Sequence, residues 1–272
     1  MSAPRSGWLE VPGGKLPYEI AGSGPPVVFV AAAICDLRQW HREFEKFSPR
    51  ATVVRYDRRG FGRAPPATAA YSDVEDLALL IQSVGKEPAI VVGNSNGGRI
   101  AIDLALDHPD LVRGLLLVAS GISGFDSDLA PEGNADYERD GARMKDIFDA
   151  WTAGRKDEAK DRMLEYWCSA QTGANRELAR EMIRDNAQEI FTDASANFNT
   201  PSKPPAVQRI GSLHVRTVVL QGDRDEPTMN HIGRWIGKSI PGARYVAVPG
   251  GDHVINLSKP DVFDASLDSL LG

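Results

Sequence analysis

The feature that most constrains the fold is a series of short apolar runs separated by segments with helical spacing. Continuous apolar runs of this length are typical of strands buried on both faces of a sheet. The runs are Val27–Val30, Thr52–Val54, Ala89–Val92, Leu115–Val118, Thr217–Leu220 and Tyr245–Val248. The helical patterns between and after them are Asp73–Val84, Asn96–Leu106, Met229–Ile240 and Pro260–Leu271. This alternation predicts an α/β fold with a mostly parallel central sheet and helices on both of its faces.

Two segments depart from the alternation. Residues Trp8–Ile20 alternate weakly around Gly13 and Gly14, which predicts an antiparallel hairpin. Between residues 121 and 207 the strands stop, and charged helical patterns take their place at Asp136–Ala153, Asp157–Trp167 and Glu177–Ile190. We therefore predict a core of residues 1–120 and 208–272 with an inserted helical cap over residues 121–207. Such an insertion can be a mere decoration, but at the strand ends of an α/β sheet a lid is the better interpretation.

Composition excludes several classes of function. The chain of 272 residues is 42% hydrophobic and 25% charged, as expected of a soluble globular protein. Its formal net charge is −6 and it has no basic run, so nucleic acid is not an expected partner. No window approaches the roughly 20 apolar residues of a membrane span. The N-terminus lacks the apolar stretch of a signal peptide, so we expect a cytoplasmic protein.

No cofactor or metal is expected either. Cys35 and Cys168 do not form a Cys-x-x-Cys pair, and we expect both to be free, buried thiols. Gly60-Phe61-Gly62 lacks the third glycine of a dinucleotide loop, and no phosphate loop or cluster of metal ligands is present.

The strongest chemical motif is Gly93-Asn94-Ser95-Asn96-Gly97. A Gly-x-Ser-x-Gly pattern alone is weak in a chain with 26 glycines, and Ser95 could simply cap a helix. However, Ser95 directly follows a predicted buried strand and directly precedes a predicted helix. In that setting a strained turn projects the serine Oγ above the sheet, which predicts a nucleophile. The N–H of Asn96 lies at the helix start, where unpaired donors favour an anion.

A serine nucleophile needs a base and a group that orients the base. Of the five histidines, only His253 lies in a short loop just past a buried strand, where a parallel sheet gathers its chemistry. The other four, which we expect to be ordinary surface or core residues, are His41, His108, His214 and His231. Three acids follow the run Thr217–Leu220 and could orient the base: Asp223, Asp225 and Glu226.

These motifs together resemble the α/β-hydrolase superfamily over essentially the whole chain. The matching segments are Val27–Val30, Tyr56–Gly62, Gly93–Gly98, His108-Pro109, Gly222–Pro227, Gly250–His253 and Lys259-Pro260. The family's Gly-x-x-Asp pattern selects Asp225 over Asp223, and its histidine motif matches His253. The resemblance thus implies a catalytic triad of Ser95, Asp225 and His253.

The resemblance also implies an oxyanion hole, in which one N–H comes from Asn96 and the other from the loop after the first parallel strand, at Ala33 or Ile34. The segment Asp36–Trp40 matches a variant of that loop, but Ala31-Ala32-Ala33 stands where family members usually have His-Gly or His-Ala-Gly. An alanine forced to positive φ costs about 1–2 kcal/mol, so the competence of this half of the oxyanion hole is open. We expect Ile34 and Trp40 to line the substrate pocket.

The leading hypothesis is hydrolysis of a carboxylic ester or lactone of a small molecule through an acyl-enzyme. A carbon–carbon bond hydrolase is an alternative, because Gly-Asn-Ser-x-Gly-Gly resembles the nucleophile turn of such enzymes. A ligand-binding homologue that does not hydrolyse is another, because fold does not determine function and the Ala31–Ala33 loop is unusual. The sequence specifies neither the substrate nor the oligomeric state.

Overall fold

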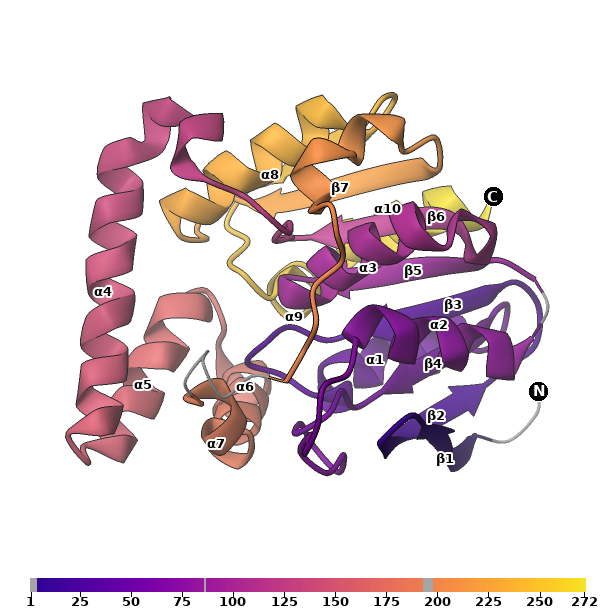
Figure 1. The fold of residues 1–272 in the computed structure, drawn as a ribbon, viewed down its shortest axis with the longest axis horizontal. Helices are drawn as coiled ribbons and strands as arrows, with labels where there is room; N and C mark the ends of the chain where they lie inside the picture. Colours follow the sequence, from indigo (N-terminus) through magenta and orange to yellow (C-terminus); the bar gives the residue numbers. More distant parts are fainter. Residues whose placement is uncertain (1–3, 86, 193–197) are drawn as a thin grey trace.

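The computed structural model describes residues 4–85, 87–192 and 198–272 of the chain (Figure 1). Its centre is an eight-stranded sheet with the order β1-β2-β4-β3-β5-β6-β7-β8. The first two strands pair antiparallel with each other, β2 pairs antiparallel with β4, and all other pairs are parallel. The strands are β1 Arg5–Val11, β2 Gly14–Ala21, β3 Pro26–Val30, β4 Thr52–Tyr56, β5 Ala89–Asn94, β6 Val112–Val118, β7 Arg216–Gly222 and β8 Arg244–Val248. The predicted α/β fold with a mostly parallel sheet is confirmed.

The side chains of the central strands point alternately into two apolar cores, one on each face of the sheet. In β3, Val27 and Phe29 belong to one core, while Val28 and Val30 belong to the other, and all four are fully buried. Burying each such side chain stabilises the folded state by about 1.5–3 kcal/mol. Helices α1 (His41–Phe47) and α10 (Pro260–Leu271) pack on the first face. The second face is covered by α2 Asp73–Val84, α3 Asn96–Asp107 and α8 Pro227–Ser239.

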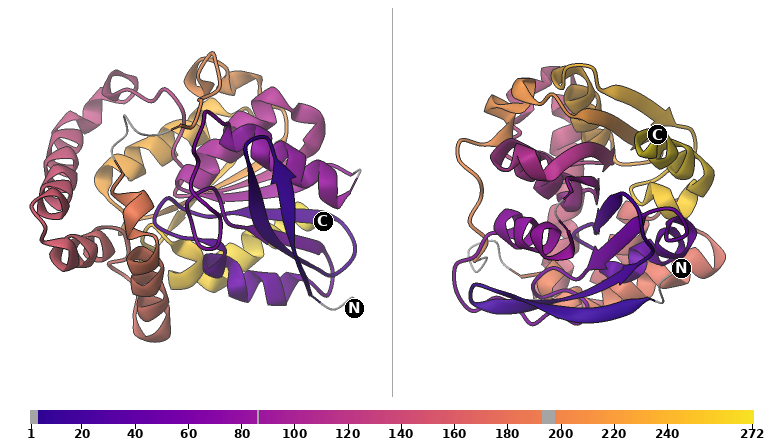
Figure 2. Two further views of the ribbon diagram at one scale, coloured as in Figure 1. Left: turned by 60° about the horizontal axis from the view of Figure 1, so that its bottom comes forward. Right: turned by 90° about the vertical axis from the view of Figure 1, so that its right-hand side faces the viewer.

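Between β6 and β7 the chain forms a group of helices at one end of the sheet, where Figures 1 and 2 show α4 standing apart from the strands. These helices are α4 Asn134–Thr152, α5 Lys156–Trp167, α6 Gly173–Asp185 and α7 Ala187–Ile190. They share the apolar core of the first sheet face, to which Ile147 and Met163 contribute. The boundary of a cap at residues 121–207 stays a prediction, and its residues 193–197 lie outside the described chain.

One predicted helix, Glu177–Ile190, is in fact two. The break falls at Asn186, whose backbone leaves the helical region at φ −97° and ψ 7°. Its side-chain amide donates to Met182 O at 2.8 Å and to Asp36 Oδ2 at 2.9 Å, and its Oδ1 accepts from Gly62 N at 2.7 Å. A short amide side chain that bonds nearby backbone competes with helical hydrogen bonding, so α6 stops here.

The remaining helical pieces are too short to give a periodic signal. They include α9 Ile255–Ser258 and a 3₁₀ turn, η1 Leu37–Trp40, which Asp36 caps by accepting from Arg38 N. The other 3₁₀ turns in the described part of the chain are η2 Pro109–Leu111, η3 Ser127–Leu129, η4 Pro131–Gly133, η6 Ala206–Gln208 and η7 Ile210–Ser212. Among the described residues, no helix has the length and apolar character that a membrane span requires.

Candidate active site

Ser95 occupies a strained turn between β5 and α3. Its backbone lies at φ 57° and ψ −117°, outside the regions that L-residues normally adopt, and such strain typically costs about 1–3 kcal/mol. Backbone bonds hold it in place: Ser95 N donates to Val118 O at 2.9 Å, and Ser95 O accepts from Gly98 N and Gly121 N at 3.0 Å each. The turn is thus over-determined by its neighbours, as expected where strain serves to present a side chain.

Glycines on both sides of Ser95 make this turn possible. A Cβ on Gly93 would lie 2.3 Å from Gly97 O, and one on Gly97 would lie 2.3 Å from Val30 O. Both distances are far below van der Waals contact. Because Gly97 has no side chain, the start of α3 can approach the end of β3 and the first residue of the Ala31–Ala33 loop.

His253 and Asp225 form a buried pair at the ends of β8 and β7. Nδ1 of His253 lies 3.0 Å from both Oδ1 and Oδ2 of Asp225. The carboxylate is also fixed by Gln221 Nε2 at 2.9 Å and by Glu226 N at 2.8 Å. An acceptor carboxylate favours the tautomer with a proton on Nδ1, which leaves Nε2 free to accept one. The alternative acid Asp223 points elsewhere and accepts from Gly250 N at 2.6 Å.

The helices between β6 and β7 contact the histidine directly. The Trp167 ring at the end of α5 lies 4.1 Å from the His253 ring, centroid to centroid, and Trp167 O accepts from His253 N at 3.3 Å. Next to it, Asp252 accepts from Ala170 N at 3.0 Å and from Gln171 Nε2 at 2.8 Å. Burial raises the pKa of the Asp252 carboxyl. The loop that carries the candidate base is therefore clamped against this helical segment.

The side chain of Asn94 links the nucleophile turn to the histidine loop. Its Nδ2 donates to His253 O at 2.9 Å and to Val118 O at 2.8 Å. Within the described chain, the hydrogen bonds of Ser95 itself are those of its backbone. Catalytic hydrogen bonds are commonly long without substrate, so a Ser95 Oγ bond to His253 Nε2 is an expectation for the substrate complex.

A cavity of about 370 Å³ opens next to this turn. Ala33, Ile34 and Asn96 line it, so three of the predicted oxyanion and pocket residues share one space. Apolar side chains from α4 and α5 and from α7 close it on the far side: Met144, Phe148, Met163, Trp167 and Ile190. Charged side chains make up part of the wall: Arg58, Asp73, Arg99 and Glu189. The size suits a small organic substrate.

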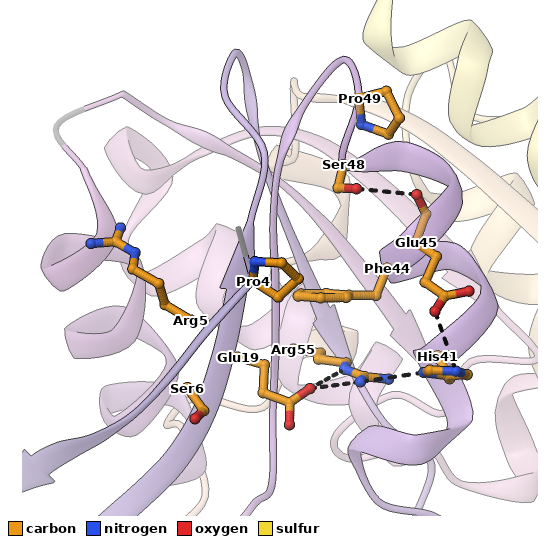
Figure 3. Close-up of a pocket in the computed structure, with 10 residues that line it drawn as sticks. All are labelled: Pro4, Arg5, Ser6, Glu19, His41, Phe44, Glu45, Ser48, Pro49 and Arg55. Carbon is orange, nitrogen blue, oxygen red and sulfur yellow. Dashed lines mark hydrogen bonds and ion pairs between the residues drawn. The ribbon is translucent and has the colours of Figure 1, made fainter. Parts of the chain in front are cut away.

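A larger hollow of about 530 Å³ lies elsewhere, between the N-terminal strands and α1 (Figure 3). Four of its titratable side chains are paired: Arg55 with Glu19 at 2.6 Å, and His41 with Glu45 at 3.5 Å. It contains none of the predicted site residues, so the smaller cavity beside Ser95 is the candidate active site. The described residues contain no cluster of His, Cys, Asp and Glu that could hold a metal ion.

Trp40 does not lie where the sequence suggested. It is fully buried in the core, with its ring 5.1 Å from Phe29 and 5.8 Å from Phe263. The turn η1 directs the indole inward, between β3 and α10, so Trp40 has no surface to offer a substrate and is left out of the proposed pocket. Ile34, by contrast, borders the cavity.

The Ala31–Ala33 loop carries no strain of the kind that glycine relieves. Among the described residues only Ser95 and Ala119 combine a side chain with positive φ, so none of the three alanines does. The loop is fixed instead by bonds to Ala32 from three residues whose role the sequence did not reveal: Gln39, Arg58 and Cys35.

Cys35 and Cys168 are free and buried, as predicted, and burial raises the pKa of both thiols.

Comparison with known families agrees with this architecture. A family model described as alpha/beta hydrolase fold matches residues 25–260, most of the chain. The chain belongs to the α/β-hydrolase family.

Several known relatives match nearly the full length of this hydrolase. It is 26% identical to the provisionally named carbamate hydrolase RutD of Azorhizobium caulinodans, over 94% of each chain. It is 28% identical to the pimeloyl-[acyl-carrier protein] methyl ester esterase of Chromobacterium violaceum, over 92% of this chain and 95% of that one. Among solved structures, Est816, described as an N-acyl homoserine lactone degrading enzyme, is 25% identical with a TM-score of 0.74, covering 97% of this chain and 99% of its own.

Proposed function

We propose that this hydrolase cleaves carboxylic ester or lactone bonds of a small organic substrate through Ser95, His253 and Asp225. The observation that carries the proposal is the buried His253–Asp225 pair, which Asn94 ties to the strained turn of Ser95. The relatives support an acyl-transfer reaction, because an ester, a lactone and a carbamate all present a carbonyl to the nucleophile.

The reaction follows from these positions. His253 Nε2 takes the proton of Ser95 Oγ, which attacks the carbonyl carbon and forms a tetrahedral intermediate. Asp225 keeps the proton on Nδ1 and stabilises the imidazolium. The intermediate collapses as His253 returns its proton to the leaving alkoxide, which in a lactone stays attached to the acyl group. Water, deprotonated by His253, then releases the acid and regenerates Ser95.

Backbone N–H groups of Asn96 and Ala33 would hold the oxyanion. Both residues line the cavity, and Asn96 opens α3, where the helix dipole favours negative charge. One such donor contributes about 2.7–4 kcal/mol of transition-state stabilisation. We further propose that residues 121–207 act as a cap, which closes the cavity with α4, α5 and α7 and excludes water from the acyl-enzyme.

The test is a panel of p-nitrophenyl esters of varied acyl length, aliphatic lactones and a carbamate, assayed with the wild type and with Ser95→Ala. We expect turnover of esters or lactones, a burst of alcohol release where deacylation is slow, and loss of activity in Ser95→Ala. Binding of these compounds without turnover, or turnover that survives Ser95→Ala, would contradict the proposal.

A further inference from the structure

A buried side-chain amide joins the Ala31–Ala33 loop to the nucleophile turn. Gln39 in η1 is fully buried, and its Oε1 accepts from Ala32 N at 3.0 Å. Its Nε2 donates to Asn94 Oδ1 at 2.7 Å. Asn94, also fully buried, immediately precedes Ser95 and donates to His253 O. One amide thus connects the loop, the residue before the nucleophile and, through Asn94, the loop of the base.

The orientation of this amide is determined by its partners. Nε2 has a second acceptor, Asn256 Oδ1 at 3.3 Å, and Asn256 Nδ2 donates back to Gln39 O at 3.0 Å. Rotating the amide by 180° would set its NH₂ against the Ala32 N–H, donor against donor. A buried network whose groups are satisfied holds a single geometry, because breaking any bond leaves a desolvated polar group.

The contacts on Ala32 in turn set the direction of the Ala33 N–H. Ala32 O accepts from Cys35 N at 3.1 Å and from Arg58 Nη2 at 3.2 Å. The Ala32 carbonyl and the Ala33 N–H belong to one trans peptide plane, in which they point in opposite directions. With the carbonyl fixed toward Arg58 and the preceding N–H fixed by Gln39, the Ala33 N–H faces the other way, and Ala33 itself is exposed on the cavity.

We propose that Gln39 is a positioning residue for the oxyanion hole. Its amide fixes the position of the Ala31–Ala33 loop relative to Ser95. In a glycine-containing loop, the backbone geometry itself would fix this position. This role rests on the proposed function, because it requires a tetrahedral oxyanion to form at Ser95. Gln39 contacts no substrate and acts only through the Ala32–Ala33 peptide and through Asn94.

The test separates binding of the tetrahedral state from binding of the substrate. Phenylboronic acid serves as the probe: Ser95 Oγ adds to its trigonal boron, the proton passes to His253, and the adduct is a tetrahedral anion. Gln39→Met removes the amide's bonds to Ala32, Asn94 and Asn256 while keeping a side chain of similar volume. We expect kcat and boronate affinity to fall together by about 10- to 1000-fold, while KM changes less than about threefold. The control is Leu80→Ala, which truncates a fully buried side chain in α2.

An unchanged kcat and boronate affinity in folded Gln39→Met would overturn the proposal, as would losses no larger than those of Leu80→Ala at matched stability. If Gln39→Met does not fold, Gln39→Glu decides, because it keeps an acceptor for Ala32 N but gives up the donor to Asn94. Its boronate affinity should fall at least about threefold, and a wild-type value contradicts the role. Failure of the proposed function differs visibly, since the wild type itself would then neither hydrolyse esters nor bind the boronate.

Discussion

The carboxylate of Asp225 is held by two donors and faces the imidazole of His253. Its two oxygens accept from Gln221 Nε2 and Glu226 N and face Nδ1 of His253. These bonds leave the carboxylate little freedom to turn away from the imidazole. Its proposed function is therefore to select the tautomer of His253 rather than to move a proton.

Replacing Asp225 by asparagine keeps the size of the side chain and reverses this selection. An amide NH₂ turned toward Nδ1 favours the tautomer with its proton on Nε2, which cannot accept from Ser95. We expect kcat for an ester substrate to fall by about 10⁴-fold with a folded protein. The matched control is Asp223→Asn. In the wild type, the Asp223 carboxylate accepts from Gly250 N and not from His253. Equal losses in the two variants would contradict the assignment of Asp225.

We expect the buried carboxyl of Glu43 to make the free energy of unfolding depend on pH. Its side chain is fully buried, and burial raises its pKa from 4.5 to about 7. Between these values the folded state binds more protons than the unfolded state, so the free energy of unfolding falls as pH rises. Relative to Glu43→Gln, the wild type should lose about 3 kcal/mol across this window and nothing further above it. Denaturant titrations of both proteins at pH 4.5, 6 and 8 measure this; a pH-independent difference would contradict it.

Sequence motifs located the candidate residues but not their supports. Ser95, Asp225 and His253 lie in short segments whose local pattern is informative by itself. Gln39 and Asn94 are 55 positions apart and meet only because β3 and β5 are neighbours in the sheet. An isolated glutamine or asparagine has no periodicity or spacing that predicts such a contact. Trp40 was placed in the pocket incorrectly for the same reason, since no sequence pattern reports the direction of one indole.

At the scale of elements, the close contact between α3 and the end of β3 depends on Gly97. A Cβ there would lie 2.3 Å from Val30 O and 2.8 Å from Ala31 O, both backbone atoms that cannot move alone. Asn96, the residue before Gly97, lines the same cavity as Ala33 of the Ala31–Ala33 loop. The position of α3 relative to β3 would therefore also set the geometry of the proposed oxyanion hole.

We expect Gly97→Ala to lower the free energy of unfolding by at least about 2 kcal/mol and kcat by at least tenfold, because the loop must shift away from α3. Gly141→Ala is the control: this residue is exposed in α4, and an added Cβ would meet nothing within 4 Å. Alanine at this position should raise the free energy of unfolding by about 0.5–1 kcal/mol. Thermal unfolding and ester kinetics of both variants test the pair. Wild-type behaviour of Gly97→Ala would show that the helix and the loop are not coupled.

Strands with continuous apolar runs and helices with strong periodicity were predictable, and short helices were not. Each predicted apolar run lies within a strand, and α2 begins and ends where its pattern does. The break at Asn186 was missed because it depends on Asp36 and Gly62, far away in the sequence. Helix α1 was missed because two turns of chain give too little pattern to distinguish a helix from a loop.

At the scale of the whole molecule, the helices between β6 and β7 and the sheet meet at the candidate base. The Trp167 ring lies on the His253 ring, and Ala170 N and Gln171 Nε2 donate to Asp252, so this segment contacts the loop of the candidate base through ring, backbone and side-chain groups. The sequence predicted a helical insertion over the strand ends from the break in alternation alone. Where those helices rest depends on side-chain packing between distant segments, which no local pattern encodes.

The central claim is that Ser95 is a nucleophile activated by this assembly. Intact-protein and peptide mass spectrometry after exposure to a fluorophosphonate measures it directly. The account predicts one adduct per chain, located on the peptide that contains Ser95, absent in Ser95→Ala and formed much more slowly in Asp225→Asn. A folded wild-type protein that stays unlabelled, or an adduct that persists in Ser95→Ala, would contradict it.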